Sequence, residues 1–150
     1  MPLLDFEKSL ATLPVVTRHA GETVLTPGSK TGQLLILKRG AVAVLKDSVE
    51  IARLDQPGLV FGELSALLDR PHTAEVRALE DSQFHVAEAV LLEKDHGMLL
   101  YVARIMAERI LAADSSLVQT KKQSQAGHPL SLDDVVHELQ EVILAGRGGF

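Results

Sequence analysis

Between residues 15 and 87, turn-forming residues divide the chain into short apolar runs, and this spacing restricts the possible folds more than any other feature. One run covers residues 33–38, and the next covers residues 41–46. Three turns separate the runs in this region: Arg39-Gly40, Lys46-Asp47-Ser48 and Gln56-Pro57-Gly58. Short strands separated at such intervals are typical of antiparallel sandwiches and barrels. We therefore expect a mainly β domain, a β-roll or jelly-roll barrel of about eight strands, over residues 15–87.

Helical patterns flank this β region on both sides. Residues 5–13 have the spacing of a short amphipathic helix, which Pro14 should end. After residue 87 the composition changes to helix-favouring residues, and residues 98–118 contain no glycine or proline. Apolar residues recur there at steps of three and four: Leu99, Val102, Met106, Ile110, Ala113 and Leu117. Met98, Tyr101 and Ile105 widen this apolar stripe. We expect a long helix with one face against the β domain and another against a partner or a lid.

These patterns predict the organisation of the whole chain. Residues 1–118 should form one domain, and the polar residues 119–130 should form a linker. Residues 131–145 should form a final amphipathic helix with Ser131 as its cap. Its expected apolar positions are Leu132, Val135, Val136, Leu139, Val142 and Ile143.

Composition and charge exclude several classes of protein. The 150 residues are 46% hydrophobic, which is enough for a packed core. The absence of cysteine excludes disulfides and thiolate metal sites. The formal net charge of −5 is unlike that of a DNA-binding protein, and no apolar run is long enough to span a bilayer. The amino terminus lacks the features of a signal peptide, so we expect a cytoplasmic location.

The segment from residue 61 to residue 74 carries the strongest functional signal. Phe61-Gly62-Glu63-Leu64 follows a strand-like run, and Pro71-His72-Thr73-Ala74 precedes the next one. A glycine-led turn into a short helix presents backbone amides to an anion, and a carboxylate beside them can accept a hydrogen bond from a sugar hydroxyl. The segment therefore suits a sugar phosphate.

Together, the strand pattern, this segment and the long helix resemble the cyclic nucleotide-binding domain. This family includes the bacterial catabolite activator protein and the regulatory subunits of cyclic AMP-dependent kinase. The resemblance covers about residues 10–117, with glycines at Gly40, Gly58 and Gly62 in addition to the two motifs. It implies a module that senses cyclic AMP or cyclic GMP as a ligand, with no cofactor or metal, and moves its C-terminal helix when the nucleotide binds.

The resemblance also assigns roles to individual residues. Glu63 would accept the ribose 2′-hydroxyl, and the amides of Gly62 and Leu64 would face the ribose and phosphate. Thr73 and Ala74 would offer further amides to the phosphate. The base side of the pocket would be lined by Val44, Leu59 and Val60.

One position departs from the family pattern, because His72 stands where the phosphate-binding arginine is expected. Arginine offers a permanently charged, bidentate fork, whereas histidine is charged only near or below a pKa of about 6.5. The exchange should cost roughly 1.5–3 kcal/mol of binding free energy. A second hypothesis therefore stays open, in which the pocket is degenerate and the fold serves as an interaction or dimerisation scaffold.

Enzymatic alternatives have little support in the sequence. A barrel metal enzyme needs two or three histidines and a carboxylate brought together on strands, and the six histidines show no such spacing. No nucleophile elbow or phosphate-binding P-loop motif is present. The residues after Leu111 are too few for a DNA-binding output domain. We therefore expect a non-enzymatic module that acts through a homodimer or a separate effector protein, with no direct contact to DNA or membrane.

Overall fold

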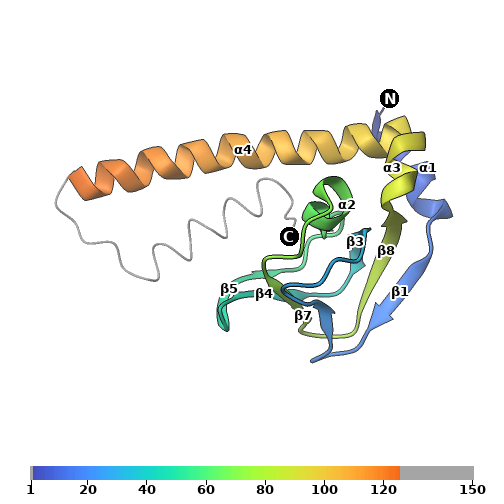
Figure 1. Ribbon diagram of the computed structural model, residues 1–150, viewed down its shortest axis with the longest axis horizontal. Helices are drawn as coiled ribbons and strands as arrows, with labels where there is room; N and C mark the ends of the chain where they lie inside the picture. The colour runs from blue at the N-terminus through green and yellow to red at the C-terminus, as the bar shows by residue number, and fades with distance from the viewer. Residues whose placement is uncertain (1, 126–150) are drawn as a thin grey trace.

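A computed structural model describes residues 2–125 of the chain (Figure 1). Eight strands and four helices are present in this part of the protein. In chain order they are α1 (Pro2–Thr12), β1 (Val15–Arg18), β2 (Thr23–Leu25), β3 (Gln33–Arg39), β4 (Val42–Lys46), β5 (Val49–Leu54), β6 (Val60–Phe61), α2 (Glu63–Leu68), β7 (Glu75–Ala78), β8 (Ser82–Glu88), α3 (Ala89–Lys94) and α4 (His96–Gln125). None of the described helices is both long enough and apolar enough to cross a membrane.

The strands form two four-stranded antiparallel sheets, with the orders β1-β8-β3-β6 and β2-β7-β4-β5. The expected β-roll of about eight strands with flanking helices is confirmed. The roll does not close into a barrel, because the two sheets remain separate. The edge strand β6 is only two residues long, and the chain turns into α2 directly after it.

Strand β3 lies between two hydrophobic clusters, which explains its uninterrupted apolar sequence. Leu35 and Leu37 belong to the cluster between the sheets, where Phe61 and Phe84 meet edge to face at 6.4 Å between ring centroids. Side chains alternate across a strand, so Leu34 and Ile36 point to the opposite face. They pack there in a second cluster with α3 and α4, which includes Leu92, Met98, Val102 and Ile105.

Helix α4 begins at a junction that also holds α1. The Asp95 carboxylate accepts hydrogen bonds from the Met98 amide at 3.0 Å and from the Ser9 hydroxyl at 2.5 Å. The Met98 bond caps the helix start, and the bonds from Ser9 and Met98 hold the pKa of Asp95 below its usual range. The first part of α4 lies over α2, and its last turns extend beyond the sheets (Figure 1).

Two expectations about this helix need correction. Helix α4 continues to Gln125, through the first seven residues of the expected linker, because lysine and glutamine favour helix when no glycine or proline interrupts them. The predicted apolar stripe is also divided. Val102 is buried, whereas Leu99, Ile110 and Leu117 are exposed. The packed face combines Val102 with Met98, Tyr101 and Ile105, the three positions expected to widen the stripe. The expected helix at residues 131–145 lies outside the described residues.

We expect Gly40→Ala to lower the free energy of unfolding by about 3 kcal/mol. Gly40 has a φ of 112°, and a Cβ placed there would lie 2.6 Å from the Ser82 Cα, so the change adds overpacking to backbone strain. Gly21→Ala is the matched control, because its φ is 86° but no atom lies within 4 Å of where its new Cβ would be. The control should lose only about 1 kcal/mol. Urea unfolding measures both, and equal losses would contradict the tight contact with Ser82.

Candidate functional site

The segment between β6 and β7 turns sharply at Gly62, which precedes the first residue of α2. Gly62 has a φ of 86°, and a Cβ there would lie 2.6 Å from the Gln33 carbonyl oxygen. The close backbone approach and the left-handed conformation both require glycine at this position. The same imaginary Cβ would lie 3.5 Å from the His72 Cε1, so the two sequence motifs meet at this point.

Hydrogen bonds fasten this segment to the loop between β2 and β3. The Ser65 hydroxyl oxygen accepts bonds from the amides of Thr31 at 2.9 Å and Gly32 at 2.7 Å. The His72 amide donates to the Ser29 carbonyl, and the His72 carbonyl accepts from the Gly28 amide, each at 2.9 Å. The path of the segment therefore depends on backbone and serine contacts and not on the charge at position 72.

Glu63 is the buried acidic residue of the site, with 6% of its surface exposed. Its Oε1 accepts a hydrogen bond from the Arg109 guanidinium of α4 at 3.0 Å. Its Oε2 has no hydrogen-bond partner among residues 2–125. Burial raises the pKa of the Glu63 carboxyl, and the positive charge of Arg109 acts in the opposite direction. One carboxylate oxygen of Glu63 thus pairs with the Arg109 guanidinium of α4, and the other remains an acceptor without a donor among the described residues.

The His72 side chain is also buried, with 2% of its surface exposed. Its Nε2 lies 3.3 Å from the Thr31 hydroxyl, and its Nδ1 lacks a partner in the described part of the chain. Burial lowers the pKa of His72, so the neutral imidazole is favoured at neutral pH. In this conformation the ring can donate or accept a hydrogen bond but carries little charge.

The remaining expected contact residues lie in different environments. Ala74, Val44 and Leu59 are buried in the cluster between the sheets, and Val60 is buried in the cluster beneath the helices. Leu64 is half-buried on α2. Their contact with a ligand stays a prediction.

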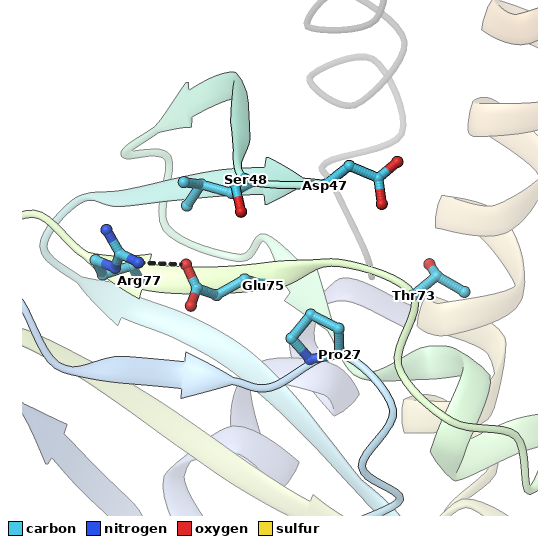
Figure 2. A pocket seen from close by; sticks show the side chains of 7 residues that line it. Pro27, Asp47, Ser48, Thr73, Glu75 and Arg77 are labelled. Atoms are coloured by element: carbon cyan, nitrogen blue, oxygen red, sulfur yellow. Dashed lines mark hydrogen bonds and ion pairs between the residues drawn. The ribbon is translucent and has the colours of Figure 1, made fainter.

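Thr73 lines an open pocket of about 460 Å³ on the outer side of β7. Figure 2 shows Thr73 at one end of this pocket and the Arg77–Glu75 ion pair at the other, with an N–O distance of 2.7 Å. Asp47 and Ser48, from the turn between β4 and β5, form the facing rim. Among the described residues, Thr73 is the one expected contact residue that lines this pocket.

Three residues of this region carry no local sequence signal. Arg109 follows an apolar part of α4, and its partner Glu63 lies 46 positions earlier in the chain. Ser65 and Thr31 hold the segment in place, but both could equally be surface residues by type. Within residues 2–125, no group of three or more His, Asp or Glu side chains is arranged to hold a metal ion.

A family model matches this chain. The cyclic nucleotide-binding domain model matches residues 15–94, which include all eight strands, α2 and α3. The matched range therefore contains both motifs of the site and ends just before α4.

A curated relative and two solved structures are similar over most of this chain. Glutaminase 2 of Bradyrhizobium diazoefficiens is 32% identical over 126 residues, covering 76% of this chain but 20% of that protein. The Thermus thermophilus catabolite activator protein superposes with a TM-score of 0.67 at 20% identity, over 81% of this chain and 63% of that one. The cAMP-bound PfPKA-R structure superposes with a TM-score of 0.59 at 22% identity, over 86% and 42%. This chain thus spans about a fifth of the curated relative it matches.

We expect Arg109→Ala to lower the free energy of unfolding by about 2–3 kcal/mol, because it leaves the buried Glu63 carboxylate without its cation. The same change made in a Glu63→Gln background should cost less than about 1 kcal/mol, since no buried charge is then left unpaired. Arg104→Ala, at an exposed position of the same helix, is the control and should cost less than about 0.5 kcal/mol. Urea unfolding of these variants gives the coupling energy between Arg109 and Glu63. Additive effects of the two changes would contradict a buried ion pair.

We expect His72 to make the protein less stable in acid. Its folded pKa is lowered, so its contribution is present above the unfolded value of about 6.5 and is lost as the pH falls through the folded pKa. The difference in unfolding free energy between the wild type and His72→Gln should therefore shift against the wild type between pH 7.5 and pH 5.5. Urea unfolding at several pH values tests this, and a difference that does not vary with pH would contradict a buried neutral imidazole.

Proposed function

The chain belongs to the cyclic nucleotide-binding domain family, and on that premise we propose that it is a regulatory module that binds cyclic AMP or cyclic GMP. The observation that carries the proposal is the buried Glu63 carboxylate with one oxygen held by Arg109 and the other unused by residues 2–125. A buried acceptor without a donor costs free energy, and a ligand hydroxyl would remove that cost. The ribose 2′-hydroxyl of a cyclic nucleotide is such a donor.

The phosphate would lie near the start of α2 and the residues after Pro71. The amides of Gly62, Leu64, Thr73 and Ala74 would offer neutral donors to it. The His72 ring would contribute a hydrogen bond and, once the anion is close, a positive charge. The bound phosphate would raise the pKa of His72 towards neutrality, opposite to the effect of burial in the free protein.

Helix α4 would carry the signal from the pocket. Arg109 already holds this helix to Glu63, the residue that would bind the ribose. A nucleotide that contacts Glu63 together with α4 would bind the docked helix more tightly than the undocked one, and would shift the population towards docking. The change would reach a partner as a new position of the helix.

The second candidate, a scaffold that binds no nucleotide, is favoured by one observation. The expected arginine is absent, and the histidine in its place is buried and largely uncharged.

The Bradyrhizobium relative is named as an enzyme and is about five times as long as the matched segment. This difference in length supports a role for the matched segment as one module beside other activities. We place this module in the cytoplasm, where cyclic nucleotides are made.

Calorimetric titration with cyclic AMP and cyclic GMP at pH 6 and pH 8 separates the two candidates. We expect up to about tenfold tighter binding at pH 6, because binding is coupled to protonation of His72. His72→Arg should tighten binding roughly 10- to 100-fold and remove the pH dependence, since a permanent charge replaces a titrating one. No binding heat from either nucleotide at millimolar concentration would support the scaffold.

A separate titration tests the role of Glu63. The 2′-deoxy form of the nucleotide that binds should bind about tenfold more weakly to the wild type, through loss of a hydrogen bond to a charged group. Glu63→Gln should remove most of that discrimination, whereas the control Glu80→Gln, on the exposed turn before β8, should retain it. Equal discrimination in all three proteins would contradict the contact between Glu63 and the ribose.

A further inference from the structure

The distal part of α4 exposes a row of large apolar side chains. Ile110, Leu111, Leu117 and Val118 are between 53% and 70% exposed. They are spaced at i, i+1, i+7 and i+8, so they lie on one side of the helix, and we refer to these four residues as the distal stripe. The packed face of α4 includes Met98, Val102 and Ile105, which turn towards the β-roll. None of the four residues of the distal stripe belongs to either hydrophobic cluster of the described residues.

We propose that residues 131–145 form a helix that folds back antiparallel along α4 and covers the distal stripe. The proposal concerns how the chain buries this surface and does not depend on nucleotide binding. The occupant is thus a segment of the same chain, joined to the helix whose face it would cover.

The length of the chain supports this arrangement. Helix α4 ends at Gln125, and five residues separate it from Ser131. Two to five residues are the usual connection between antiparallel neighbouring helices, and this connection contains Gly127 and Pro129, which end and redirect helices. A helix of 15 residues is about 22 Å long, which reaches back from the end of α4 to about residue 111.

The apolar pattern of residues 131–145 matches the distal stripe when the two helices pair about a turn near residue 128. This register places Leu139 beside Leu117 and Val118. It places Val142 and Ile143 within one turn of Ile110 and Leu111. The apolar positions of the segment recur at steps of three and four, as a helix packed along one face requires.

Charge also fits an antiparallel arrangement. Lys121 and Lys122 are exposed near the end of α4. In the same register, Asp133 and Asp134 lie beside these lysines in the first turn of the segment. Carboxylates in the first turn of a helix and ammonium groups in the last turn of its neighbour are each favourable there, and they also attract one another.

A second copy of the chain fits the stripe less well. Asp114 is exposed and lies between the two halves of the stripe, one turn from Ile110 and one turn from Val118. A symmetric pairing centred on the stripe would bring Asp114 against its own copy, and such like charges destabilise a helix pair. A segment joined by five residues also has an effective concentration in the millimolar range, which a separate copy rarely reaches.

Disulfide trapping in the full chain without nucleotide tests the proposal. The natural chain has no cysteine, so introduced thiols are the only ones present. Val118→Cys combined with Glu138→Cys should oxidise rapidly to an intramolecular disulfide, seen on a non-reducing gel and by intact mass. Arg104→Cys combined with Glu138→Cys is the matched control, since position 104 is exposed on α4 but about 20 Å further along its axis. Equal oxidation of both pairs would overturn the proposal.

Two further measurements separate the possible occupants. Val118→Cys alone should remain monomeric, and its rapid conversion to a disulfide-linked dimer would assign the stripe to a second copy and overturn the proposal. Leu139→Asp should speed amide hydrogen exchange in residues 110–122 about tenfold, whereas the control Gln140→Asp, off the apolar face, should leave it within about twofold. Unchanged exchange in Leu139→Asp would also overturn the proposal. None of these measurements depends on nucleotide binding, so failure of the proposed function would not alter their results.

Discussion

A carboxylate can lie beside an apolar core only where a cation or a hydrogen-bond donor compensates for its lost hydration. Glu63 is in that position at the first residue of α2, and Arg109 of α4 supplies the cation. This one requirement links the short helix of the site to the long helix that covers it. It also leaves the second oxygen of Glu63 as a buried acceptor without a donor within residues 2–125.

The backbone around His72 is held by groups other than the His72 side chain. The amide and carbonyl of His72 are bonded to Ser29 and Gly28, and Ser65 holds the neighbouring loop. These contacts involve backbone groups and a neutral hydroxyl, so they are indifferent to the side chain at position 72. The side chain at this position is a titratable group, and burial lowers the pKa of the His72 imidazole and favours its neutral form.

Helix α4 has two parts with different surroundings. Its first turns are fixed by the cluster around Met98 and Val102, by the Asp95 cap and by a hydrogen bond of 2.8 Å from the Tyr101 hydroxyl to the Gly58 carbonyl. Its last turns extend beyond the sheets and present the distal stripe. The contact of Arg109 with Glu63 lies between these two parts of the helix.

Local sequence was sufficient to predict a region of about eight short strands over residues 15–87, the turn at Gly62 and the long helix, because turn residues and helix propensity act over a few neighbours. The two motifs also identified the family, because their residue types and their spacing are specific to it. Tertiary structure decided that the sheets stay separate, that Ile110 and Leu117 are exposed, and that Arg109 meets Glu63. The reason is that burial and charge pairing depend on groups far apart in the chain. An apolar spacing shows that a helix has a face to cover, but only the packed neighbours determine which part of that face is covered.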